Sequence, residues 1–117
     1  MPYLKIQTNL ALDRDTANQL MASASKLISQ ELGKPEELVM IALEREEYMF
    51  FNGSEAPVAF LELKAVGLPG RRTMNLSQAL SEMIEAEVPV RRDRIYIKFI
   101  DVQRGMWGWN GKTLSEH

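Results

Sequence analysis

The order strand, helix, strand occurs twice in this chain, and this duplication limits its possible folds more than any single motif does. The first copy spans about residues 2–43 and the second about residues 57–100. An internal repeat of about 55 residues indicates an architecture more strongly than either copy alone. Right-handed crossovers place the helix of each copy on one face of the sheet. We therefore expect an α+β fold of two layers, with a four-stranded sheet and two helices on one face.

In the first copy, residues 2–8 alternate between apolar and polar side chains, which is typical of a strand. Asp13 and Asp15 favour the start of a helix, and Gly33 favours its end. The helix is predicted from apolar residues at helical spacing, namely Ala17, Leu20, Met21, Ala24, Leu27 and Ile28. Residues 38–43 form a nearly continuous apolar run, which predicts a strand buried on both faces.

The second copy has the same order of signals. Residues 57–66 predict a strand, Pro89 ends the following helix, and residues 95–100 predict the last strand. The helix is predicted from a second apolar stripe, formed by Leu76, Ala79, Leu80, Met83 and Ile84. Residues 34–38 and 91–95 are the equivalent joints, because each lies between a helix and the strand that follows it.

The helices can cover only one face of this sheet, yet residues 38–43 are apolar on both sides. A face that apolar is rarely left in contact with water. Burying it would contribute about 25 cal/mol per Å² of apolar area. We therefore expect a homo-oligomer that covers the open face, although this pattern does not fix the number of subunits.

Length and composition fit one domain over residues 1–117, and they exclude several functions. The net charge of −2 gives no general attraction to nucleic acid or to a membrane surface. The chain has no cysteine and one histidine, His117, so we expect no metal site and no Ser-His-Asp triad. No signal-peptide pattern and no apolar run of membrane-spanning length occur, which indicates a cytoplasmic protein and leaves non-classical secretion open.

The dipeptide Met1-Pro2 has a chemical consequence if the initiator methionine is removed. Removal would leave Pro2 with a free secondary amine at the start of a buried strand. A free α-amino group has a pKa of about 7.7–8.0, and burial lowers that pKa. The resulting neutral amine could take and return a proton near neutral pH. The alternative interpretation is that Pro2 is only a convenient first residue for a strand.

Further motifs follow in an order and spacing that resemble the tautomerase superfamily, and within it the macrophage migration inhibitory factor family. The resemblance runs from Pro2 to about Leu114 and rests on Thr8-Asn9, Gly33-Lys34-Pro35, Phe51-Asn52-Gly53-Ser54, Pro57, Val66-Gly67, Asp93-Arg94-Ile95-Tyr96-Ile97 and Gly108-Trp109-Asn110. It implies a homotrimer with an active site at each subunit interface. It also implies cofactor-independent keto–enol tautomerisation of α-keto acids such as phenylpyruvate, with dopachrome derivatives as model substrates.

The resemblance also implies roles for single residues. Pro2 would be the catalytic base, and Lys34 would bind the substrate carboxylate or enolate oxygen. The plain alternative for Lys34 is a cation that stabilises a helix end. Val66 would contact substrate through its backbone amide, and Tyr96 would reach the pocket from the neighbouring subunit.

Trp107 and Trp109 are expected to wall an aromatic pocket for a phenyl-bearing substrate. The alternative is that they belong to a hairpin that turns at Asn110-Gly111, and both interpretations can hold together.

The chain departs from the family at several positions. Lys98 stands where the commonest animal members have asparagine, and it shares a strand face with Tyr96. It could strengthen anion binding, alter substrate choice or point away from the pocket, and we include it among the substrate-binding candidates. The family's Cys-x-x-Cys pair falls on Val58 and Leu61, which excludes thiol chemistry. Leu114 replaces the usual aromatic residue. The alternative function is a cytokine-like binding or signalling protein whose tautomerase activity is incidental.

Overall fold

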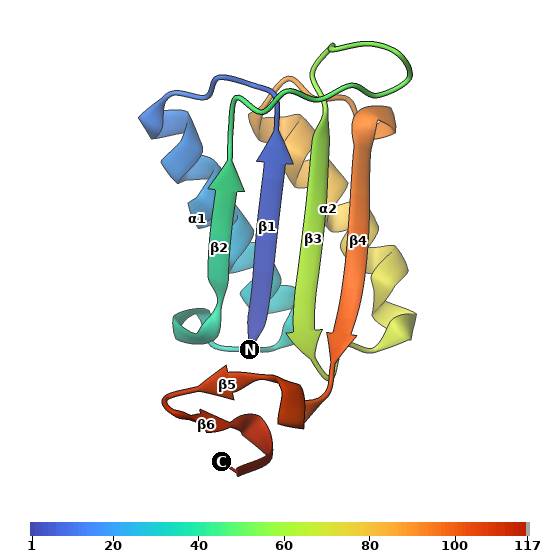
Figure 1. The fold of residues 1–117 in the computed structure, drawn as a ribbon. Coiled ribbons are helices and arrows are strands. Elements are labelled where there is room, and N and C mark those ends of the chain that lie inside the picture. The colour runs from blue at the N-terminus through green and yellow to red at the C-terminus, as the bar shows by residue number, and fades with distance from the viewer. Residues whose placement is uncertain (117) are drawn as a thin grey trace.

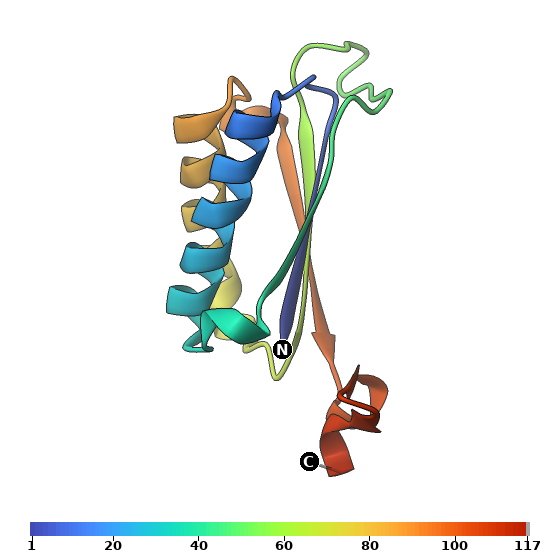
Figure 2. The same ribbon diagram turned by 90° about the vertical axis from the view of Figure 1, so that its left-hand side faces the viewer.

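The computed structural model describes residues 1–116, and the expectation for His117 lies outside them. A four-stranded sheet forms one layer and two helices, packed side by side, form the other (Figures 1 and 2). The sheet contains β1 (Pro2–Thr8), β2 (Met40–Glu44), β3 (Ala59–Val66) and β4 (Ile95–Val102), and the helices are α1 (Arg14–Leu32) and α2 (Thr73–Glu87). The predicted α+β fold of two layers is therefore confirmed.

The strand order is β2-β1-β3-β4. β1 pairs with β2 in parallel, β3 pairs with β4 in parallel, and the two central strands β1 and β3 are antiparallel. Each copy of the repeat thus forms one parallel pair whose helix crosses over the same face of the sheet. Because β1 and β3 run in opposite directions, equivalent points of the two copies lie at opposite ends of the sheet.

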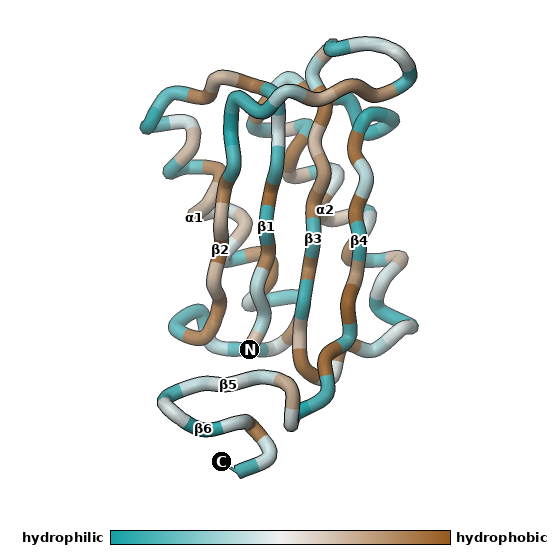
Figure 3. The backbone as a smooth tube through the Cα atoms, viewed as in Figure 1, coloured by the Kyte–Doolittle hydropathy of each residue, from teal (hydrophilic) through white to brown (hydrophobic). Residues whose placement is uncertain are grey.

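The core lies between the sheet and the helices. β1 and β3 alternate between buried and half-buried residues, and their buried side chains include Leu4, Ile6, Leu61 and Leu63. Figure 3 shows this alternation as a change of hydropathy along both central strands. The helices contribute fully buried residues from the predicted stripes, namely Leu20, Ile28, Leu76, Leu80 and Ile84. Neither helix within residues 1–116 has the length and apolar character needed to cross a membrane.

The predicted ends of α1 are confirmed. The Asp13 side chain accepts a hydrogen bond from the Thr16 backbone N–H at 2.8 Å, which caps the first turn. Gly33 ends the helix in the left-handed conformation, with φ of 63°, and its N–H bonds to the carbonyl of Ser29. The two joints contain equivalent 3₁₀ turns, η1 (Glu36–Leu38) and η3 (Arg92–Arg94), and the following strands begin after them.

The prediction that residues 38–43 form a strand buried on both faces is wrong for the single chain. The strand order places β2 at an edge of the sheet, and within residues 38–43 only Val39, Ile41 and Leu43 pack against the core, each partly buried. Met40 points to the other face and is 65% exposed. An edge strand has a neighbour on one side only, so apolar composition alone did not reveal its exposure.

The open face, which is the sheet surface away from the helices, is also more polar than expected. Lys5, Glu62 and Lys98 lie side by side in one row across β1, β3 and β4. Tyr3 with Lys64, and Gln7 with Phe60, form the rows on either side. Charged and aromatic side chains are therefore mixed on this face. Less apolar area is available for burial between copies than the sequence predicts, so burial alone favours an oligomer less strongly.

Beyond β4 the chain forms a small C-terminal unit at the end of the sheet where β1 begins (Figure 1). It comprises η4 (Arg104–Met106), β5 (Gly108–Trp109), β6 (Lys112–Thr113) and η5 (Leu114–Glu116). Asn110 and Gly111 connect β5 to β6 with φ angles of 53° and 80°. Two successive positive φ values are those of the tight hairpin turn that the sequence predicted.

Candidate active site

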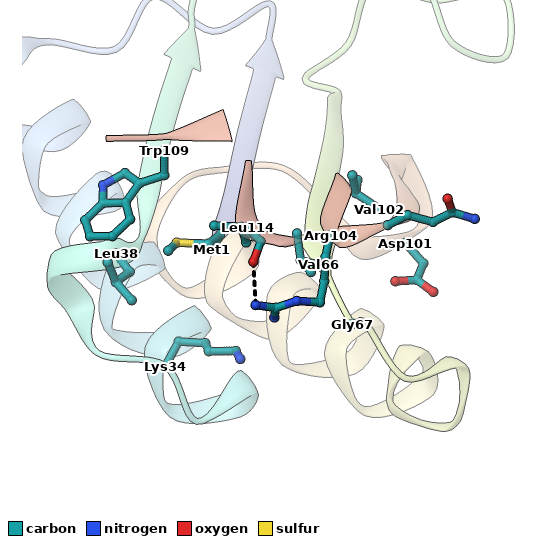
Figure 4. A pocket seen from close by; sticks show the side chains of 11 residues that line it. Met1, Lys34, Leu38, Val66, Gly67, Asp101, Val102, Arg104, Trp109 and Leu114 are labelled. Atoms are coloured by element: carbon teal, nitrogen blue, oxygen red, sulfur yellow. Dashed lines mark hydrogen bonds between the residues drawn. The ribbon is translucent and has the colours of Figure 1, made fainter. Parts of the chain in front are cut away.

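Several chain segments meet where β1 begins, and they line three cavities that open to solvent and share lining residues. The first has a volume of about 540 Å³, the second about 110 Å³ and the third about 390 Å³. Met1 lines all three. The walls come from the end of α1, the ends of β3 and β4, and the C-terminal unit (Figure 4). The first residue of the chain therefore occupies the point where the cavities converge.

Pro2 is fully buried as the first residue of β1, opposite Ala65 of β3. It lines the second cavity together with Lys34 and Val66. Three residues predicted from the sequence are thus brought together by the fold. In the chain with Met1 attached, the Pro2 nitrogen belongs to a peptide bond and has no basic lone pair.

The free amino group in this structure is that of Met1, and its environment shows what the site does to an amine. The pKa of the Met1 amino group lies below its ordinary value of 8.0. Burial is the larger cause, because removal from water disfavours the ammonium form. The positive charge of Lys34 is the second cause. Both effects favour a neutral amine at this end of β1.

Lys34 is held by the end of α1. Its backbone N–H donates to the Ser29 carbonyl at 3.1 Å, and the Ser29 hydroxyl donates to the Lys34 carbonyl. The side chain is exposed and extends toward the cavities from the turn after Gly33 (Figure 4). Of the ion pairs formed within residues 1–116, none includes Lys34. Its charge is therefore available to an anionic ligand.

Val66 is the last residue of β3 and lines the first and second cavities. Gly67 follows it with φ of 69°, which turns the chain away from the sheet. The Asp101 carboxylate fixes this turn by accepting a hydrogen bond from the Leu68 N–H at 2.9 Å. The turn that follows Val66 is therefore held in place beside the first and second cavities.

The two tryptophans flank the site from the C-terminal unit. Trp109 lines the first and third cavities, and Trp107 lines the third. The Leu114 N–H donates to the Trp107 carbonyl at 2.9 Å, so the hairpin closes on itself. Leu114 is 5% exposed and completes the wall of the first cavity. The hairpin and the predicted aromatic wall are thus the same piece of chain.

Tyr96 and Lys98 do not reach this site within one chain. Tyr96 begins the exposed side of β4, at the far end of the sheet, where its ring centroid lies 4.8 Å from that of Phe51. Lys98 lies in the middle of the open face beside Glu62. Either residue could contribute only from a second copy, so their roles stay predictions.

Sequence reasoning missed Leu38 and Arg104, which line the first cavity. The apolar run predicts a strand at Leu38, whereas Leu38 ends η1 and lines the cavity. Arg104 follows β4, which extends to Val102 rather than ending at residue 100. Its position depends on that extension and on the hairpin beyond it, and no local motif signals either. Residues 1–116 contain no group of three histidine, cysteine, aspartate or glutamate side chains placed to hold a metal ion.

Comparison with known proteins gives a consistent result. Residues 1–115 match the macrophage migration inhibitory factor family. A macrophage migration inhibitory factor homolog of Brugia malayi is 32% identical, over 98% of this chain and 100% of its own length. A crystal structure of the homologue from Prochlorococcus marinus superposes with a TM-score of 0.90 at 38% identity, covering 96% of this chain and 98% of that one. The macrophage migration inhibitory factor of Xenopus tropicalis is 28% identical over 98% of this chain and 100% of its own length.

Proposed function

This chain belongs to the macrophage migration inhibitory factor family of the tautomerase superfamily, and on that premise we propose that it is a keto–enol tautomerase whose base is the amine of Pro2. The observation that carries the proposal is the burial of Pro2 at the start of β1, in a cavity wall that it shares with Lys34. Removal of Met1 would turn the Pro2 nitrogen into a secondary amine. It would also clear the point where the three cavities converge.

The proposed reaction moves one proton and involves no net oxidation. The neutral Pro2 amine takes a proton from the carbon beside the ketone. The electron pair of that C–H bond forms the C=C bond of the enolate, and negative charge develops on the former carbonyl oxygen. The Pro2 ammonium then returns the proton to this oxygen and yields the enol.

The electrostatics of the site support both the removal of the proton from carbon and the stabilisation of the enolate that results. Burial and Lys34 lower the pKa of an amine at this end of β1, as they do for Met1. A neutral amine is the form that can accept the proton. Lys34 also offers a positive charge to the substrate carboxylate or to the developing enolate oxygen, and a fixed charge of this kind stabilises the transition state.

We propose phenylpyruvate-like α-keto acids as substrates, with dopachrome-type compounds as model substrates. A volume of about 540 Å³ falls within the range of about 300–1,000 Å³ of ligand pockets. Trp109, Leu38 and Leu114 supply apolar wall for an aryl group, and Lys34 supplies the cation for its carboxylate. The proposed proton transfer uses only side-chain and N-terminal groups of the protein and needs no cofactor.

We further propose that the working assembly is a homotrimer, in which Tyr96 and Lys98 of one copy complete the site of the next. This assembly would explain how two residues of the predicted site can lie far from Pro2 in the same chain. The aromatic and charged side chains of the open face would then lie between copies instead of facing only water.

The test compares two forms of the protein that differ at the N-terminus. Mass spectrometry first establishes that Met1 is absent from the processed form. A second form carries one alanine between Met1 and Pro2, so that Pro2 stays within the chain after processing. The processed form is expected to convert phenylpyruvate to its enol, measured by ultraviolet absorbance, and the extended form is expected to lose this activity.

Pro2→Ala is the matched control, because it keeps an N-terminal amine while changing its basicity and geometry. Its kcat/KM should lie between those of the processed and extended forms. Equal activity of the processed and extended forms would show that Pro2 is not the base. A processed protein without any tautomerase activity would favour the binding or signalling alternative.

A further inference from the structure

The first cavity contains a second cation that the proposed reaction does not use. Arg104, at the start of η4, lines the cavity together with Lys34, which follows α1. Figure 4 shows both side chains at the cavity, projecting from different elements. We propose that Arg104 is a specificity-determining residue that binds a second anionic group of the substrate. The preferred substrates would then be 2-oxo acids whose side chain ends in a carboxylate. This inference rests on the proposed tautomerase function.

Arg104 is anchored but its charge is not neutralised. Its Nη2 donates a hydrogen bond to the Leu114 carbonyl at 2.7 Å. A neutral carbonyl fixes the position of the guanidinium and leaves its positive charge in place. Among residues 1–116 no carboxylate forms an ion pair with Arg104. A guanidinium has five N–H donors in a planar fork that matches a carboxylate, so most of them remain available to a ligand.

Two acidic residues at the first and second cavities are engaged by neighbouring groups, and a third, Glu37, lines only the third cavity. Asp101 lines the first cavity, but its carboxylate accepts the hydrogen bond from Leu68 that fixes the turn after β3. Glu31 lines the second cavity and is paired with Arg72 at 3.1 Å. The first cavity therefore has two cationic side chains and one acidic side chain in its wall. The neutral N–H of Leu68 leaves the charge of Asp101 in place, so these side chains carry one net positive charge and favour an anionic ligand.

The two cations have separate anchors, which suits a ligand with an anionic group at each end. The main chain of Lys34 is held by the end of α1, whereas the guanidinium of Arg104 is held by a backbone carbonyl of the C-terminal unit. Lys34 also lines the Pro2 cavity, whereas Arg104 lines only the first cavity. The 2-oxo acid end would therefore lie between Pro2 and Lys34, and the distal carboxylate would meet Arg104.

The experiment uses two substrates that differ in this distal group. The kcat/KM of the processed protein is measured for 4-carboxyphenylpyruvate and for phenylpyruvate. The wild-type protein should prefer the carboxylated substrate. Arg104→Gln removes the charge and keeps a hydrogen-bond donor for Leu114. It should lower the ratio of the two kcat/KM values by about tenfold or more, since a hydrogen bond to a charged group is lost.

Two further variants separate charge from structure. Arg104→Lys keeps the positive charge and should retain part of the preference. Lys112→Gln removes a cation of β6 that lines none of the three cavities, and it should leave the ratio unchanged. Absence of any preference in the wild-type protein, or an unchanged ratio in Arg104→Gln, would overturn the proposal.

A binding measurement distinguishes this failure from failure of the proposed function. Calorimetry measures the affinities of 4-carboxyphenylacetate and phenylacetate. Neither compound has a ketone, so neither can be tautomerised. Tighter binding of the dicarboxylate that is lost in Arg104→Gln supports the role of Arg104 even if the protein turns over neither 2-oxo acid. Equal binding of the two acids contradicts the role of Arg104 even if phenylpyruvate is turned over.

Discussion

At the scale of single residues, the site modifies the properties of whichever amine stands at the start of β1. Burial and the charge of Lys34 lower the pKa of the Met1 amino group. Pro2 lies deeper than Met1, since Pro2 is fully buried and Met1 is half-buried. The same two causes should therefore act on Pro2 once it is the N-terminal residue.

The first prediction concerns pH. In the processed protein, kcat/KM should rise with pH as the Pro2 amine loses its proton, with an inflection below the ordinary α-amino value of about 7.7–8.0. Lys34→Met removes the positive neighbour, so the pKa of Pro2 should rise and the inflection should move to higher pH. NMR titration of ¹⁵N-labelled Pro2 measures this pKa directly. An unchanged pKa in the variant would contradict the electrostatic role of Lys34.

The same shift has a consequence for stability. An amine whose pKa is lowered by folding holds its proton more tightly in the unfolded chain. The free energy of unfolding should therefore increase as the pH is raised from the lowered pKa to 8.0. Lowering the pH through the same range should remove this stabilisation. Urea unfolding at several pH values checks the sign.

The second prediction separates the catalytic role of Lys34 from a structural one. Losing a charged contact to the reacting oxygen should cost about 2.7–4 kcal/mol in the activation barrier. Losing a cation at a helix end should cost under about 1 kcal/mol of stability. Lys34→Ala should thus lower kcat/KM about a hundredfold or more while the melting temperature barely changes.

Lys98 provides the comparison for this variant. If Lys98 of a neighbouring copy shares the substrate anion, Lys34→Ala and Lys98→Ala should be strongly non-additive in a double-mutant cycle. Full activity of Lys34→Ala with loss of activity in Lys98→Ala would move the anion-binding role to Lys98.

At the scale of elements, the repeated strand-helix-strand order was predictable from the sequence, and the exposure of the edge strand β2 was not. The alternation of β1 and the stripes of α1 and α2 follow from period and spacing, which a sequence displays directly. The position of β2 at an edge depends on strand order, which is a property of pairing between distant segments. Arg104 was missed for a related reason. Its place in the cavity wall depends on β4 continuing to Val102 and on the hairpin that follows, and no local motif predicts either. The family resemblance named Pro2, Lys34 and Val66, and the structure brings all three to the second cavity, while their roles stay predictions.

The third prediction concerns the turn that presents Lys34. Gly33 has φ of 63°, and a residue with a Cβ atom in this conformation costs roughly 1–2 kcal/mol. Gly33→Ala should therefore destabilise the protein by about 1 kcal/mol and also lower activity, because Lys34 follows directly. Thermal and urea unfolding measure the first effect, and the phenylpyruvate assay measures the second.

Gly70 provides a matched control at the start of η2 (Gly70–Arg72). Its φ is not positive, and an added Cβ atom would meet nothing within 4 Å. Gly70→Ala should change stability by no more than about 0.5 kcal/mol. Equal effects of the two substitutions would show that the left-handed turn is not what holds Lys34.

At the scale of the whole molecule, the two ends of the sheet differ. One end has Pro2, Lys34 and the cavities, and the other has Tyr96 with its aromatic neighbour Phe51. The antiparallel pairing of β1 with β3 produces this separation. An interface that joins the two ends uses two different surfaces, and such interfaces form a closed ring when the rotation between copies closes. The proposed homotrimer is a ring of three copies, so light scattering of the processed protein should give about three times the monomer mass. A well-folded monomer would contradict the shared site.

The fourth prediction tests the shared site by mixing defective chains. One chain carries the extra alanine before Pro2, and the other carries Lys98→Glu, which should repel an anionic substrate. Each should be inactive alone. After unfolding and refolding together in equal amounts, about one quarter of the sites should combine an intact Pro2 with an intact Lys98. Recovery of activity in the mixture is the expected result, and no recovery would contradict a site that is shared between copies.

In the proposed assembly, where copies share sites, the separation of Pro2 from Tyr96 and Lys98 has a genetic consequence. Two alleles that each destroy function could restore part of it when expressed in one cell, since their products would complement each other at the contacts between copies. Conversely, a chain with a defect at one end of its sheet would inactivate sites that it shares with normal chains in a mixed assembly. The dominance of a mutation would then depend on which end of the sheet it alters and on how the copies mix.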